Sequence, residues 1–252
     1  MTLSVDLNAD MGESFGPWTM GEDAALLDIV TSANIACGFH AGDPDVMART
    51  MALAAEKGVG IGAHPGFDDL QGFGRRRIKL PYETLANLVR YQVAAAAGMA
   101  SAAGAQLAHV KLHGAMSNMA SEDGEMARVA YAAAAQAAPD VPMVVLAATP
   151  QQAACEALGL PYAAEIFADR AYEEDATLVD RSKPGAMIHD PTEAAARMVA
   201  MVKAGAILTA SGKRIETRID TICCHGDTPA AVEIARRTKQ ALLEAGISVQ
   251  RF

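Results

Sequence analysis

The chain has 252 residues and a mass of 26.2 kDa, and its 21 basic and 30 acidic side chains give a formal net charge of -9. Hydrophobic residues make up 51% of the sequence, which is enough for a substantial core and excludes a disordered chain. The acidic balance, with a pI near 5.1, argues against nucleic acid as a partner, because phosphate binding needs a basic face.

The sequence shows no sign of a membrane segment or an export signal. No run of about 18 apolar residues is free of charge or glycine, so we expect no transmembrane helix and no membrane partner. The first residues carry neither a basic region nor a long apolar stretch, so no secretory signal is expected. The four cysteines show no paired spacing, and we therefore expect a reducing, cytoplasmic location.

Short β-like runs alternate with alanine-rich helical stretches along the whole chain. The predicted strands are residues 3–8, 32–37, 59–63, 106–113, 143–147, 163–169 and 220–225, with a further short strand at 247–252. The predicted helices are residues 43–57, 81–103, 122–138, 151–158, 191–204 and 228–245.

Strand and helix alternation of this kind implies a parallel sheet covered by helices, which is the α/β class. Seven or eight units fit a TIM-like (β/α) barrel better than the alternative of an open doubly wound sheet. We expect residues 1–252 to form a single domain, with a small β-hairpin inserted near residues 206–218.

Polar side chains interrupt strands that should be almost wholly apolar in a buried parallel sheet. Asp6, Asn8 and Asp10 alternate with apolar residues and therefore share one face of their strand. The same pattern, or a position at or just past a strand end, is found for Asn34, His40, His64, His109, Lys111, His113, Glu165, Asp169, His225 and Asp227. Because the carboxyl ends of parallel strands meet at the barrel mouth, this is where barrel enzymes place their chemistry.

Structural explanations compete with functional ones at several of these positions. Asp6 could be explained as a hydrogen-bonding residue near the bottom of the barrel. His40 could be an ordinary loop residue, and His109 could be a histidine buried in the core. Lys111 and His113 are harder to explain in this way, because an unpaired buried cation is costly. His189 precedes a helix and is expected at the surface.

The glycine patterns do not predict a nucleotide site. Residues 58–63 match GxGxxA, but they precede and form a strand instead of opening a helix. Residues 212–214 lack the spacing and the following Ser or Thr of a phosphate loop.

Taken together, the polar motifs resemble those of the LamB/YcsF family, the family of the 5-oxoprolinase A subunits. They are residues 6–13 (DLNADMGE), 32–44 (SANIACGFHAGDP), 62–69 (GAHPGFDD), 72–76 (GFGRR), 109–115 (HVKLHGA), 165–170 (EIFADR) and 224–229 (CHGDTP). Three positions depart from the family pattern: Ala9 replaces Cys, Leu112 replaces Pro, and Ser117 replaces an aromatic residue. None of these changes removes an ionisable side chain of the candidate site.

The resemblance implies a seven-stranded barrel related to the glycoside hydrolase and deacetylase folds. It also implies a hydrolase activity, the ATP-dependent opening of 5-oxo-L-proline to L-glutamate, carried out together with two companion subunits, B and C. Because this chain lacks a phosphate loop, ATP would be bound or used mainly by the complex. Two alternatives stay open: a metal-dependent amidase or deacetylase acting alone, and a non-catalytic lactam-binding subunit.

On this basis, roles can be assigned to the polar residues. The catalytic candidates are Asp10, His64, Lys111, His113, Asp169 and His225. The substrate-binding candidates are Asn8, Asn34, His40, Arg75, Glu165, Arg170 and Asp227. A divalent metal, if one is bound, would use Asp10, His40, His64 and His113.

Overall fold

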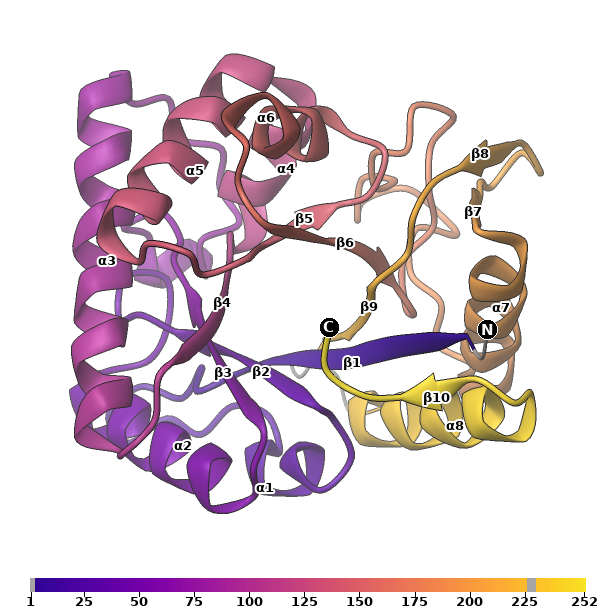
Figure 1. Cartoon of the computed structure of the whole chain (residues 1–252), viewed down its shortest axis with the longest axis horizontal. Coiled ribbons are helices and arrows are strands. Elements are labelled where there is room, and N and C mark those ends of the chain that lie inside the picture. Colours follow the sequence, from indigo (N-terminus) through magenta and orange to yellow (C-terminus); the bar gives the residue numbers. More distant parts are fainter. Residues whose placement is uncertain (1–2, 226–229) are drawn as a thin grey trace.

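A computed structural model describes residues 3–225 and 230–252, and its centre is a closed barrel of seven parallel strands (Figure 1). In barrel order they are β1 (Ser4–Met11), β2 (Ser32–Ala36), β3 (Gly60–His64), β4 (Leu107–Lys111), β5 (Met143–Leu146), β6 (Tyr162–Phe167) and β9 (Thr221–Cys224). The barrel closes because β9 pairs with both β6 and β1, so that Thr221 lies opposite Glu165 on one side and Asp6 on the other. The predicted seven-stranded TIM-like barrel is confirmed.

Helices cover the outside of this barrel (Figure 1). They are α1 (Asp23–Leu27), α2 (Pro44–Glu56), α3 (Tyr82–Ala102), α4 (Gly114–Glu122), α5 (Gly124–Ala137), α6 (Pro150–Leu158), α7 (Pro191–Ala204) and α8 (Ala231–Glu244), with a 3₁₀ turn, η1, at Leu70–Gly72. Three helices begin with a capping side chain followed by proline at the first helical position: Asp43 before α2, Thr149 before α6 and Asp190 before α7. None of the helices in the described part of the chain has the length and apolar character that a bilayer crossing requires.

Strand β1 shows how alternation divides apolar from polar side chains. Val5 and Leu7 are buried in the apolar core between the strands and the helices. Asp6 and Asn8 point the other way, into the barrel. Asp6 Oδ2 accepts from Thr221 Oγ1 on the paired strand β9 at 2.5 Å, and Asn8 Nδ2 donates to Glu165 Oε1 on β6 at 3.0 Å. The barrel interior is therefore a polar network and not the usual stack of branched apolar residues.

Several boundaries differ from the sequence-based expectation. Strand β1 continues to Met11, so Asp10 lies within it, and β4 ends at Lys111, so His113 is the N-cap of α4. Helices α1 and α4 were not predicted. Strand β10 (Ser248–Val249) pairs only with the start of β1 and lies outside the closed barrel, while β7 (Ala206–Leu208) and β8 (Arg214–Glu216) form a separate antiparallel pair.

Gly62 makes room for one of the interior histidines. It lies opposite His109 in the pairing of β3 with β4, and a Cβ atom at position 62 would be 2.0 Å from His109 Nε2. The His109 ring is fully buried, and Nε2 bonds to Asn34 Oδ1 at 2.6 Å. Glycine at this position therefore lets a histidine occupy the barrel interior.

We predict that Gly62→Ala destabilises the protein by about 1–3 kcal/mol or more, because the added methyl group overpacks a filled interior. The matched control is Gly98→Ala, since Gly98 is exposed within α3 and its added Cβ would meet nothing within 4 Å. In that control the free energy of unfolding should rise by up to about 1 kcal/mol, because alanine has a higher helix propensity than glycine. Urea unfolding followed by circular dichroism measures both, and equal stability of the two variants would contradict the packing described.

Candidate active site

A buried lysine joins two carboxylates inside the barrel. Lys111 Nζ, at the end of β4, lies 3.0 Å from Asp10 Oδ1 on β1 and 2.9 Å from Glu165 Oε1 on β6. It also donates to Cys223 Sγ at 3.0 Å and lies 5.1 Å from the centre of the Phe167 ring. All three ionisable side chains are 8% exposed or less, so their charges are largely shielded from water.

The two carboxyl groups beside Lys111, Asp10 and Glu165, differ in how readily they ionise. Although burial opposes ionisation, the charge of Lys111, with a contribution from the nearby His64 side chain, holds the pKa of Asp10 well below its ordinary value. Against the same burial, the carboxylates and Cys223 raise the pKa of Lys111 well above its usual range. Burial raises the pKa of Glu165 in spite of the nearby ammonium. Asp10 and Lys111 therefore form the ion pair, and Glu165 is the carboxyl more readily protonated.

The Asn34 amide bonds to the ionised carboxylate and links it to Asn8. Asn34 Nδ2 donates to Asp10 Oδ1 at 2.8 Å and to Asn8 Oδ1 at 2.7 Å. His109 Nε2 approaches Asn34 Oδ1 at 2.6 Å, and burial lowers the pKa of His109 to about 3, so the ring is neutral and donates from Nε2. Each side chain in this chain of bonds is fixed by its neighbour, which holds Asp10 in one orientation.

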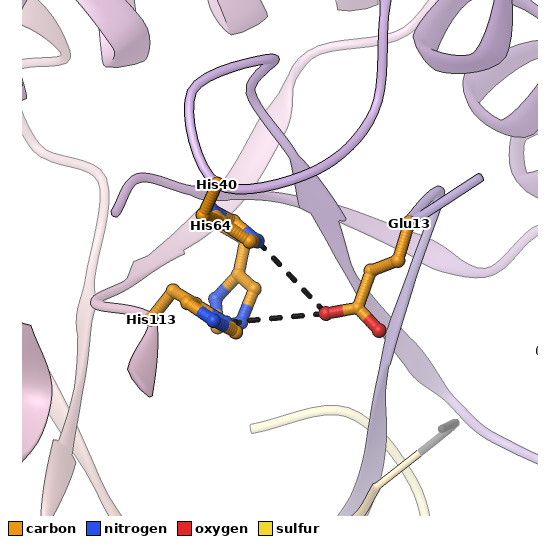
Figure 2. A group of neighbouring side chains, drawn as sticks. All are labelled: Glu13, His40, His64 and His113. Atoms are coloured by element: carbon orange, nitrogen blue, oxygen red, sulfur yellow. Dashed lines mark hydrogen bonds and ion pairs between the residues drawn. The ribbon is translucent and has the colours of Figure 1, made fainter. Parts of the chain in front are cut away.

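Three histidines lie above this network with a fourth residue, Glu13 (Figure 2). His64, the last residue of β3, bonds through Nδ1 to the Lys111 carbonyl oxygen at 2.8 Å. His113 bonds through Nε2 to the Phe73 carbonyl oxygen at 2.8 Å, and its Nδ1 lies 3.0 Å from His64 Nε2. His40 stacks on His113 with the ring centroids 3.6 Å apart, and Glu13 Oε1 is 3.9 Å from both His40 Nε2 and His113 Nδ1.

Burial keeps two of these rings uncharged. It holds the pKa of His40 well below the ordinary value, assisted by repulsion from His113. Burial also lowers the pKa of His113 well below that value, with His64 adding to the effect. Both rings therefore offer neutral imidazole nitrogens at neutral pH.

A second histidine and carboxylate pair lies across the barrel mouth. His225 follows β9, and its Nδ1 lies 2.8 Å from both carboxylate oxygens of Asp169. The His225 ring stacks on Phe167, and although burial opposes ionisation, the histidine holds the pKa of Asp169 below its ordinary value. Because Nδ1–H is held by the carboxylate, Nε2 is the nitrogen left to accept a proton.

These groups surround a cavity of about 310 Å³ whose wall carries more cationic than anionic side chains, although Glu122, which pairs with Arg77, and Asp180 also line it. Asp10, His64, Lys111, His113 and His225 line it, together with the guanidinium-bearing residues Arg75, Arg77, Arg170 and Arg181. Arg170 is buried, donates from Nη2 to the Val179 carbonyl at 2.6 Å, and has no hydrogen-bond partner for Nε among the described residues. Burial, reinforced by repulsion from Arg181, lowers the pKa of Arg170 to about 10. Such a wall suits a small anionic ligand.

The structure gathers most of the predicted site residues at one place. The catalytic candidates Asp10, His64, Lys111, His113 and His225, and the binding candidates Arg75 and Arg170, line the cavity. The other described candidates do not line it: Asn8, Asn34 and Glu165 lie within the barrel network, Asp169 supports His225, and His40 lines a neighbouring cavity. Asp227 falls outside the described residues. His189 is exposed, as expected.

The sequence analysis missed Glu13, Arg77 and Arg181. Glu13 is buried beside the histidines and follows Asp10 by three residues, so the rule that selects polar residues past strand ends would have found it. Arg77 directly follows the motif that ends at Arg76, whereas Arg181 lies in a long loop without any sequence signal.

Known proteins resemble the chain over its whole length. A protein of Ruegeria pomeroyi that is named as the A subunit of 5-oxoprolinase is 64% identical over 248 residues, covering 98% of each chain. The crystal structure of a lactam utilization protein from Thermus thermophilus matches with a TM-score of 0.92 at 42% identity, covering 99% of this chain and 100% of that one.

More distant structures share only the fold. The catalytic domain of a peptidoglycan N-acetylglucosamine deacetylase from Eubacterium rectale matches with a TM-score of 0.53 at 13% identity, covering 100% of this chain and 89% of the other. This likeness agrees with the expected relation of the barrel to deacetylase folds.

Family membership follows from the match over nearly the full length. The model of the LamB/YcsF family matches residues 5–252, and the relative from Ruegeria pomeroyi shares 64% of its residues with this chain. The motifs that carried the resemblance in the sequence supply most of the side chains at the barrel mouth. The chain belongs to the LamB/YcsF family.

Proposed function

We propose that this chain is the barrel subunit of an ATP-dependent 5-oxoprolinase, which opens 5-oxo-L-proline to L-glutamate with two companion subunits, B and C. The name of the relative that is 64% identical over 98% of both chains supports this role. The observation that carries it is the cavity itself, which combines a cationic wall with an ionised carboxylate and an oriented histidine.

The chemistry explains why more than one subunit takes part. A five-membered lactam is a stable amide, so its hydrolysis is coupled to ATP. Transfer of the γ-phosphoryl group to the lactam carbonyl oxygen gives an activated carbon, to which water adds. The ring C–N bond then breaks as the nitrogen takes up a proton, which leaves an acyl phosphate, and a second water hydrolyses this acyl phosphate to the carboxylate and phosphate. Neither glycine pattern of this chain has the strand–loop–helix context that holds nucleotide phosphates, so we assign the phosphorylation step to the companions.

The cavity then receives the small anionic lactam or its activated form. Arg75 and Arg170 are the candidates for holding the carboxylate or phosphate, because a guanidinium binds either group through two parallel hydrogen bonds. Lys111 contributes positive charge, but its ammonium is already shared by Asp10 and Glu165. It therefore acts mainly by keeping Asp10 ionised beside the cavity.

We assign the general base to His225. Its Nδ1–H is held by Asp169, which leaves Nε2 to take a proton from the attacking water. The pKa of Asp10 lies well below its ordinary value, so this carboxylate is a poor base and serves better as a fixed charge that orients water or His64. The proton that His225 Nε2 takes up is then available to the leaving ring nitrogen, while His64 and His113 line the same cavity.

We predict that the purified chain alone releases no glutamate from 5-oxoproline, with or without ATP. The partners without this chain should also be inactive, and only the three subunits together should give ATP-dependent release. Glutamate measured by an enzyme-coupled assay separates the three cases. Turnover by this chain alone would favour a stand-alone amidase, and turnover by the partners alone would reduce the barrel to an accessory.

We predict that Asp169→Asn lowers turnover of the full complex by about 100-fold or more while the fold is retained, because the amide no longer fixes the histidine tautomer. His225→Gln should lose at least as much. His189→Gln provides the matched control, since His189 is an exposed histidine that does not line the cavity, and its turnover should not change. Equal losses in His189→Gln and His225→Gln would show that the cavity is not the reaction site.

A further inference from the structure

Four potential ligand atoms converge from four separate segments of the chain (Figure 2). Glu13 follows β1, His40 lies in the loop after β2, His64 ends β3, and His113 precedes α4. One atom from each residue lies within 4.8 Å of all the others, and all four residues are buried. Among the described residues, a second group that meets the same distance limit, Asp10, Cys223 and His225, has three members and a single histidine.

Main-chain carbonyls fix which nitrogen of two histidines carries the proton. A carbonyl oxygen only accepts, so His64 donates from Nδ1 to the Lys111 carbonyl, and His113 donates from Nε2 to the Phe73 carbonyl. The remaining nitrogens, His64 Nε2 and His113 Nδ1, face each other at 3.0 Å. Two facing lone pairs repel, so this geometry calls for a cation between the nitrogens, either a proton or a metal ion.

His40 provides an independent observation that favours a metal ion. Its side chain is completely buried, and neither ring nitrogen has a hydrogen-bond partner among the described residues. A buried polar group left in this state is costly. The ring is nevertheless held tightly, because a Cβ atom at Gly66 would lie 2.6 Å from His40 Nδ1 and one at Gly74 would lie 2.6 Å from His40 Cβ. Glycines thus leave space for an imidazole that has no hydrogen-bond partner in the described part of the chain.

We propose that Glu13, His40, His64 and His113 bind one divalent transition-metal ion of the zinc type. Three neutral imidazoles and a carboxylate form a donor set that suits Zn²⁺ and its neighbours better than Mg²⁺ or Ca²⁺, which prefer oxygen ligands. Ligands of a tetrahedral ion with bonds of ~2.0–2.1 Å lie about 3.3 Å apart, close to the observed separations of 3.0 and 3.9 Å. Because an ion lies in the plane of each imidazole that binds it, one of the stacked rings of His40 and His113 must turn toward the ion when it binds.

The carboxylate ligand in this proposal is Glu13 and not Asp10, which the sequence analysis favoured. Asp10 Oδ1 is held by Lys111 at 3.0 Å and by Asn34 at 2.8 Å, while Oδ2 lies 3.4 Å from His64 Nε2. Glu13 Oε1 instead lies 3.9 Å from both His40 and His113, so we assign Glu13 as the ligand and Asp10 as the partner of Lys111. The Lys111 and Phe73 carbonyls act as the outer partners that orient the histidine ligands.

The cluster also separates two cavities. His64 and His113 line the cationic cavity of about 310 Å³, whereas Glu13 and His40 line a second cavity of about 440 Å³ whose wall includes Phe15 and Trp18. An ion at the cluster would therefore lie in the wall of the candidate active site without occupying the space of the substrate. Its binding is independent of whether the proposed oxoprolinase reaction is correct.

The test is zinc binding by the whole purified chain, without companions or substrate. After treatment with a chelator and its removal, calorimetric titration with ZnCl₂ should show one ion per chain. Glu13→Gln and His40→Asn should each weaken binding by more than the ~100-fold that loss of an outer partner costs. His189→Asn, which changes an exposed histidine, should bind zinc like the unaltered chain.

A second measurement covers the case in which a cluster variant does not fold. Co²⁺ added to the unaltered chain should give visible ligand-field absorption of the strength typical of a four-coordinate centre, and one equivalent of Zn²⁺ should abolish it. Failure to bind either ion stoichiometrically would overturn the proposal and identify the cation between His64 and His113 as a proton. Unchanged zinc affinity in folded His40→Asn would also overturn it.

Discussion

The ammonium group of Lys111 is the interaction on which the interior of this barrel depends. It lies 3.0 Å from Asp10 and 2.9 Å from Glu165, and the lysine side chain is only 5% exposed. Two carboxylates buried this deeply without a cation would carry a large desolvation penalty. Because the lysine compensates them, strands β1, β4 and β6 can direct polar side chains inward, where most barrels of this kind place branched apolar residues.

The same residue links the barrel interior to the candidate site above it. While its side chain pairs with carboxylates, the main-chain carbonyl of Lys111 accepts from His64 Nδ1 at 2.8 Å and so directs His64 Nε2 toward His113. The charge of Lys111 also keeps Asp10 ionised, although burial opposes ionisation. The inner network and the histidine cluster are therefore not independent, and a change at Lys111 is expected to affect both.

The sequence predicted the fold well because the barrel follows from local patterns, namely strand–helix alternation and caps such as Asp43 before Pro44. Alternation along β1 also predicted that Asp6, Asn8 and Asp10 share a face. It did not predict that α4 starts directly after His113, nor that Glu13 joins the histidines. The position of Glu13 just past a strand end could have placed it at the barrel mouth, but its contact with the histidines depends on loops that meet only in the folded chain. The assigned catalytic and binding roles stay predictions.

The central claim is tested most directly by the unfolding free energy of Lys111→Met compared with that of Lys111→Met/Asp10→Asn/Glu165→Gln. Removal of the ammonium alone leaves two buried carboxylates uncompensated, so the single variant should lose about 3–5 kcal/mol of stability. The triple variant removes both charges as well and should recover most of that loss, because the buried amides carry no net charge. A single variant as stable as the unaltered chain, or a triple variant no more stable than the single one, would contradict the account.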